Sequence, residues 1–258
     1  MGLELIFVLF IIGFIGSFIS GMVGIGGSII KYPLILYIPP LLGVGAFTAS
    51  EVAGISAVQV FFAALAGMFA FRKDGYLNKR IIFIMGISVL VGSFIGGFGS
   101  DFLSNNMINA IYGIMATIAA IMMFVPKKQV DDAQNQQIQF NSIVAMIASF
   151  IVGLGAGIVG AAGAFLLVPI MLVLLKIPTR VTIASSLAIT FLSSIGSTLG
   201  KVLTDQVLYG PALVMIVASL ISAPLGANIS KKMNTKILQV ILAILILATA
   251  IKIWLEFL

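Results

Sequence analysis

The chain contains a glycine motif that occurs twice, each time followed by a short apolar run that ends at a proline. The first copy covers residues 21–28 and precedes Pro33, and the second covers 157–164 and precedes Pro169. With the two regions aligned at an offset of 136, 8 of 25 positions are identical. Glycine and proline both interrupt helices. In a membrane protein, two corresponding segments broken in this way indicate an internal repeat with a binding region at the breaks.

The composition excludes an ordinary soluble domain, because 61% of the residues are hydrophobic and only 9% are charged. A helix of about 20 apolar residues crosses a hydrocarbon core of about 30 Å. Stretches of this length recur along the whole chain, so we expect an all-α polytopic membrane protein with about eight full spans. The expected spans are 3–23, 48–71, 81–99, 107–125, 143–159, 182–200, 208–228 and 237–255.

Two shorter apolar pieces, 28–38 and 164–175, directly follow the glycine motifs. Each covers only about half of the hydrocarbon core, so we interpret each as a half-helix that continues a broken or re-entrant hairpin. The polar stretch 127–141 then separates a first membrane repeat, 1–126, from a second, 142–258. We expect each repeat to contain one glycine-broken hairpin and three spanning helices.

The positions of the positive charges predict that the two repeats have opposite orientations. Lysine and arginine favour the cytoplasmic side of short loops. If each repeat crosses the membrane an odd number of times, eleven of the thirteen loop cations lie inside and only Lys201 and Lys252 lie outside. An even number of crossings would move five of the eleven outside. We therefore expect inverted repeats, with a cytoplasmic linker and both termini outside.

The glycine breaks also predict an anion site. A helix start carries unpaired N–H groups and the positive end of the helix dipole, and glycine lets a ligand approach the backbone closely. Two such starts, related by inversion, would meet near the membrane midplane and hold one small anion. The candidates are Gly24, Gly26, Gly27, Ser28, Gly160, Ala162, Gly163 and Ala164. Glycines also serve close helix packing, which we expect for the stretch 92–99.

Few polar residues lie within the hydrophobic segments. Lys31 follows the first break by about one turn and could attract an anion, although its counterpart Leu167 is apolar. Glu51 lies near the start of the next span and is a candidate carrier of a coupling proton. The two charges could instead pair with each other, or Glu51 could lie at the outer interface. Further candidate donors to an anion are Ser50, Ser185, Ser186 and Thr190, and Gln59 lies in mid-span.

The residue types in the chain argue against an enzyme. There is no cysteine and no histidine, and the carboxylates do not cluster. Thiolate, imidazole and paired-carboxylate chemistry is therefore excluded, and we expect neither a metal nor a cofactor. The loop cations explain the net charge of +6 without nucleic-acid binding.

Two further parallels accompany the glycine–proline motifs: residues 49–53 match 184–188, and 96–100 match 226–230. Together these features resemble the sulfite exporter TauE/SafE family over nearly the full length. The resemblance implies a bacterial inner-membrane permease that exports a small anion, such as sulfite, sulfoacetate or thiosulfate. It carries over the motif residues Gly24, Gly26, Gly27, Pro33, Gly160, Gly163 and Pro169.

Three alternatives from other classes remain open at this point. An anion channel would use similar half-helix dipoles. A permease could instead take a small carboxylate-type anion, and a membrane scaffold would need no binding site. A homo-oligomer is compatible with any of these, and a transporter has the lipid bilayer, the anion and a coupling proton as its partners.

The charge pattern generates a topological prediction. A reporter fused at Asn135 should be cytoplasmic, whereas the same reporter fused after Leu258 should be external, because the inverted arrangement puts most loop cations inside. Reporter activities that depend on the cellular compartment measure this directly. Finding both fusions on the same side would contradict the inverted arrangement.

Overall fold

The computed structural model describes residues 1–24, 28–124, 138–161 and 163–257, and the regular elements in these residues are all helical. The first half contains α1 (Leu3–Val23), α2 (Ser28–Leu41), α3 (Ala49–Phe71), α4 (Lys79–Gly99), the 3₁₀ turn η1 (Ser100–Phe102) and α5 (Asn105–Phe124). The second half contains α6 (Ser142–Val159), α7 (Ala164–Pro169), the π-helical η2 (Ile170–Leu174), α8 (Thr179–Leu203), α9 (Tyr209–Lys232) and α10 (Thr235–Phe257).

Seven helices in this part of the chain are long and apolar enough to cross a membrane, namely α1, α3, α4, α5, α6, α8 and α9. The expected all-helical, multi-pass architecture is therefore confirmed, with seven candidate spans identified in the described residues. The eighth expected span, 237–255, coincides with helix α10, whose apolar stretch Lys236–Ala248 lies within the described side chains. The two expected short helices are also present, as α2 and as α7 with η2. Of the predicted linker, only residues 138–141 are described.

Glycines end the two helices that precede the short pieces. Gly24 follows α1 with a φ of 78°, and Gly160 follows α6 with a φ of 70°. Gly163, with a φ of 64°, then precedes α7. Side chains other than hydrogen are strained in this left-handed region, so these three positions require glycine. The motifs thus interrupt the helices as their sequence predicts.

Polar side chains begin three of the long helices. Thr48 caps α3 by accepting the N–H of Glu51, and Asn78 caps α4 by accepting the N–H of Ile81. Asn141 accepts two N–H groups at the start of α6. These caps satisfy donors that the helix itself leaves unpaired, and they fix where the loops end.

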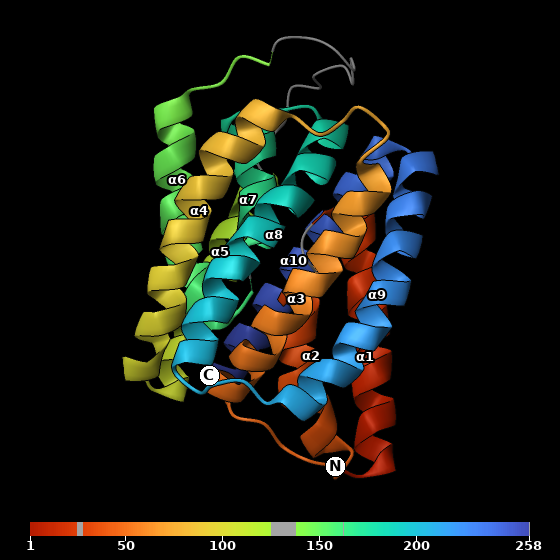
Figure 1. Cartoon of the computed structure of the whole chain (residues 1–258), viewed down its shortest axis with the longest axis vertical. Coiled ribbons are helices and arrows are strands. Elements are labelled where there is room, and N and C mark those ends of the chain that lie inside the picture. Colours follow the sequence, from red (N-terminus) through yellow and green to blue (C-terminus); the bar gives the residue numbers. More distant parts are fainter. Residues whose placement is uncertain (25–27, 125–137, 162, 258) are drawn as a thin grey trace.

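The helices form a bundle in which the two halves are interleaved (Figure 1). Both marked termini lie towards one end, and the α3–α4 connection lies at the other. Helices α3 and α9 run towards that second end, whereas α4 and α8 run away from it. The most extensive helix contacts are α4 with α6, α1 with α9, α4 with α8, α3 with α9 and α3 with α8. Every one of these contacts joins the first half to the second.

Glycines allow the closest of these contacts. A Cβ added at Gly96 of α4 would lie 2.0 Å from the carbonyl oxygen of Leu154 in α6. A Cβ added at Gly226 of α9 would lie 1.9 Å from the carbonyl oxygen of Phe18 in α1. Small residues let membrane helices approach until their backbones touch. The packing interpretation of the stretch 92–99 is therefore confirmed.

This packing predicts a stability difference between two glycines of α4. Gly96→Ala should lower the free energy of unfolding by about 1–3 kcal/mol, because the new methyl group overlaps a backbone carbonyl of α6. Gly99→Ala is the control, since a Cβ there meets nothing within 4 Å. Thermal unfolding of the purified protein in detergent measures both. Equal stability of Gly96→Ala and the parent would show that this contact is looser than described.

Candidate functional site

The structure describes some of the predicted site residues and leaves others undescribed. Gly26, Gly27 and Ala162 lie outside the described residues, and the side chain of Ser28 is likewise not described. The remaining candidates, including Lys31 and the polar residues of α3 and α8, are described and can be located.

The two glycine breaks contact different helices. The carbonyl oxygen of Gly24 accepts a hydrogen bond of 2.7 Å from Ser186 Oγ, near the start of α8. A Cβ added at Gly160 would lie 1.8 Å from the carbonyl oxygen of Ala53, near the start of α3. These two helices begin at opposite ends of the bundle (Figure 1). Each break is thus held by the other half, near a different end.

The starts of the two half-helices are not packed together in the described residues, where α2 and α7 share no extensive contact. Gly163 instead packs on α6, since a Cβ there would lie 2.7 Å from Val152 Cγ1. Ala164, the first residue of α7, is completely buried. The expected meeting of both half-helix starts around one anion stays a prediction, because Gly26, Gly27 and Ala162 lie outside the described residues.

Lys31 lies at the centre of a buried polar cluster. Its side chain is 0% exposed. The ammonium group donates hydrogen bonds to Gln59 Oε1 and, at 3.4 Å, to Ser17 Oγ. Gln59 Nε2 in turn donates to Ser17 Oγ at 2.7 Å. The cluster therefore joins α1, α2 and α3 through one lysine, one amide and one hydroxyl group.

This cluster lies close to the middle of the spanning helices. Gln59 is the eleventh of the 23 residues of α3, and Ser17 is the fifteenth of the 21 residues of α1. Gly16 leaves room for the lysine, because a Cβ there would lie 2.2 Å from Lys31 Cγ. The Lys31 side chain, which belongs to the first turn of α2, thus places its ammonium group in the interior of the bundle.

The partners of Lys31 are neutral. In the described part of the chain, no carboxylate forms an ion pair or hydrogen bond with its ammonium group. A buried charge without a counter-charge is costly, and ionisable residues within membrane helices mark functional sites. A small anion would supply the missing charge. The cluster can offer it the ammonium group and the N–H donors of the Gln59 amide.

Glu51 has a different role from pairing with Lys31. Its Oε2 accepts the backbone N–H of Thr48 at 2.8 Å, while its own N–H donates to Thr48 Oγ1 at 3.3 Å. This reciprocal arrangement is a capping box. The expected pairing with Lys31 is wrong, because Gln59, which binds the ammonium group, lies about 12 Å farther along α3 at 1.5 Å per residue. Proton coupling by Glu51 stays a prediction.

Three of the four predicted hydroxyl donors have structural partners. Ser50 Oγ donates to Gln206 Oε1 at 2.9 Å, and Ser186 Oγ donates to Gly24. Ser185 Oγ accepts the backbone N–H of Asn78 at 3.1 Å. Thr190 differs, because its buried hydroxyl has no hydrogen-bond partner in the described residues.

Other polar residues of α8 extend this pattern. A stripe of completely buried polar side chains follows one helix face at spacings of four, three, four and four residues. The hydroxyl of Ser193, like that of Thr190, has no partner in the described residues. This α8 stripe consists of Ser186, Thr190, Ser193, Ser197 and Lys201. Its spacing is visible in the sequence, and a search for polar residues on one helix face would have found it.

Comparisons with known proteins agree with this architecture. The pattern of the family described as sulfite exporter TauE/SafE matches residues 9–253. The Bacillus subtilis protein named probable membrane transporter protein YunE is 25% identical over 256 residues, which cover 93% of this chain and 94% of that protein. A Methanocaldococcus jannaschii protein with the same general name is 26% identical over 251 residues, or 93% and 92% of the two chains. No solved structure matches the chain significantly.

The cluster around Lys31 generates a prediction for stability. Gln59→Leu should lower the free energy of unfolding by about 2–3 kcal/mol, because the buried ammonium group loses its amide acceptor. The double variant Lys31→Met with Gln59→Leu should recover most of this loss, since it removes the charge together with its partner. Thermal unfolding of the single and double variants forms the measurement. Strictly additive losses would contradict the coupling of the two side chains.

Proposed function

The chain belongs to the sulfite exporter TauE/SafE family of membrane transporters, and we propose that it is a secondary transporter of a small anion. The proposed substrate is a sulfur oxyanion or an organosulfonate such as sulfite, sulfoacetate or thiosulfate, moved outwards by alternating access. The family description supports the substrate class. The buried polar residues support an anionic substrate and the proposed binding at Lys31.

Lys31 is the observation that carries this proposal. Its ammonium group is fully buried near the middle of the bundle, and its partners are the neutral oxygens of Gln59 and Ser17. A transported cation would be repelled at this point, whereas an anion would neutralise the charge. A sulfonate or sulfite oxygen accepts strong hydrogen bonds from an ammonium group and from amide N–H groups.

The α8 stripe supports a path for the anion between the two glycine motifs. It begins at Ser186, which bonds to the first glycine motif at Gly24. Near its other end, Ser197 Oγ lies 3.4 Å from the carbonyl oxygen of Gly157 in the second motif. The unpartnered hydroxyls of Thr190 and Ser193 lie between these contacts along the helix. Hydroxyl groups can donate successive hydrogen bonds to an anion that moves along the helix.

We also propose that the two halves form inverted repeats, which would give alternating access its two equivalent states. In the proposed repeat, α1 corresponds to α6, α3 to α8 and α4 to α9. The contact of α1 with α9 then corresponds to that of α6 with α4, and the contact of α3 with α9 corresponds to that of α8 with α4. Both members of each pair are among the most extensive contacts. The opposite directions of α3 and α8 in Figure 1 support inversion. On this proposal, the membrane is the bacterial inner membrane, with the linker inside and both termini outside.

Counter-flow in liposomes tests the transport function. The purified protein should exchange labelled sulfite for internal sulfite, with saturation, and sulfoacetate or thiosulfate should compete better than acetate or sulfate. Preference for acetate would favour a carboxylate permease. Flux without saturation or counter-flow would favour an anion channel, and no flux would exclude transport of these anions.

Lys31→Met should reduce this exchange at least about tenfold, because a charge-assisted hydrogen bond to the anion is lost. Lys236→Met is a matched control at an exposed lysine in the first turn of α10, outside the cluster. Both variants must remain monodisperse in detergent with unchanged thermal unfolding. If correctly folded Lys31→Met protein exchanged sulfite normally, the binding site would lie elsewhere, and the unpartnered hydroxyls of α8 would be the next residues to change.

A further inference from the structure

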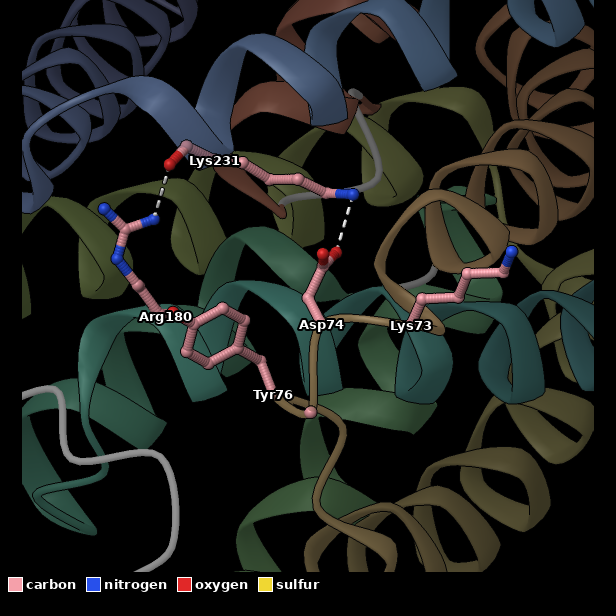
Figure 2. A pocket seen from close by; sticks show the side chains of 6 residues that line it. Lys73, Asp74, Tyr76, Arg180 and Lys231 are labelled. Carbon is pink, nitrogen blue, oxygen red and sulfur yellow. Dashed lines mark hydrogen bonds and ion pairs between the residues drawn. The ribbon is translucent and has the colours of Figure 1, made fainter.

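A cavity of about 610 Å³ opens among charged residues between the two halves of the bundle. The first half contributes residues 73–76 of the α3–α4 loop, and the second contributes the start of α8 and the end of α9. Figure 2 shows Arg180 beside Tyr76, Lys231 opposite Asp74, and Lys73 extending away from the other side chains. The cavity lies at the end of the bundle that carries the α3–α4 connection. Its lining residues are Lys73, Asp74, Gly75, Tyr76, Arg180 and Lys231.

The lining has an excess of positive charge. Three cations and one carboxylate give it a net charge of +2 at neutral pH. The three cations come from different elements, since Lys73 lies in the loop, Arg180 in α8 and Lys231 in α9. A concave surface with one sign of charge concentrates ligands of the opposite sign. The chemistry of the cavity therefore favours an anion.

One ion pair connects the two halves across this cavity. Lys231 Nζ lies 2.6 Å from Asp74 Oδ2, and it also donates to the carbonyl oxygen of Ala70. Figure 2 shows the two charged groups pointing towards each other. Both side chains are partly exposed, at 25% and 30%. Such a pair contributes little to stability, so an incoming anion can replace the carboxylate at modest cost.

The neighbouring arginine is held in place by the backbone. Arg180 donates from Nη1 to the carbonyl oxygen of Lys231 at 3.0 Å and from Nη2 to that of Met233 at 3.2 Å. Its guanidinium carbon lies 6.0 Å from the centre of the Tyr76 ring. These contacts hold the guanidinium group beside the opening, and neither of its two hydrogen-bond acceptors is a carboxylate. Lys73, in contrast, forms no hydrogen bond or ion pair within the described residues.

We propose that this cavity is a second anion-binding site, a vestibule in which Arg180 and Lys231 receive a small oxyanion such as a sulfonate, sulfite or phosphate group, while Lys73 adds positive charge at its edge. The inference rests on the proposed transport of an anion for its biological role, although binding itself can be measured independently. Asp74 holds Lys231 while the vestibule is empty. When an oxyanion takes its place, the ion pair between the two halves opens.

Two variants that break the same ion pair provide the test. Lys231→Met should weaken binding of sulfoacetate about tenfold, because a cation that contacts the ligand is lost. Asp74→Asn should instead strengthen binding several-fold, because it frees Lys231 and removes a repelling charge. Lys232→Met is the control at the adjacent lysine, which does not line the cavity. A purely structural ion pair would give changes of the same sign in both variants.

Isothermal titration of the full chain in detergent, with sulfoacetate and with inorganic phosphate, measures the affinities, while size-exclusion and thermal unfolding confirm the fold. The titrations are repeated in the Lys31→Met background, where vestibule binding should persist. Opposite changes in the two ion-pair variants support the vestibule. Equal changes, or none, overturn it.

Lipid composition distinguishes the source of the oxyanion. In nanodiscs with phosphatidylglycerol, a vestibule that binds lipid headgroups should take up sulfoacetate more weakly than in nanodiscs with phosphatidylcholine alone. A vestibule for the soluble anion should bind it equally well in both.

If Asp74 and Lys231 control binding but the parent protein shows no counter-flow, the vestibule is supported and the proposed transport function is contradicted. If counter-flow is normal and unaffected by both variants, the vestibule fails and transport stands.

Discussion

Backbone contact at glycine is the constraint on which the rest of the bundle depends. Lipid tails are as apolar as leucine side chains, so hydrophobicity alone does not hold membrane helices together. Here the backbones of α4 and α6 meet at Gly96, and those of α9 and α1 meet at Gly226. Both contacts join helices from different halves. The most extensive helix contacts therefore run between the halves and not within them.

This scaffold repeats its packing but not its chemistry. The glycine breaks at Gly24 and Gly160 share a left-handed conformation, and each lies against the first turns of a long helix in the other half. Seven residues after each of these glycines, however, Lys31 of the first half aligns with Leu167 of the second, and both side chains are completely buried. The first half thus contains a buried cation that the second replaces with an apolar side chain. On the proposed repeat architecture, two similar halves would supply two related conformations, while a cation at this position of one half alone would mark a single binding site.

The sequence predicted the helices well because long apolar runs and glycine breaks are local signals. The spans were found to within a few residues, and α7 begins at Ala164, directly after the second motif. The role of Glu51 was also visible as the pattern Thr48-x-x-Glu51, which is typical of a capping box, but its position near the membrane suggested a coupling role instead. The partners of Lys31 were not predictable, since Ser17 and Gln59 lie on two other helices and only the fold brings them together.

The two ends of the bundle differ in how their cations are held, and this difference bears on direction. At one end Lys231 pairs with a carboxylate of the other half, Asp74. Towards the other end Lys201 is completely buried and donates, at 2.7 Å each, to the neutral oxygens of Ser100 and Gln206. A carboxylate competes with an arriving anion, whereas a hydroxyl or amide oxygen does not repel its charge in the same way. An anion that entered at the Asp74 end would therefore displace a competitor, and would then meet Lys31 and Lys201, whose hydrogen bonds go to neutral oxygens. On the proposed export, with the α3–α4 loop cytoplasmic, the anion would therefore meet the carboxylate-paired Lys231 before it reached Lys31 and Lys201.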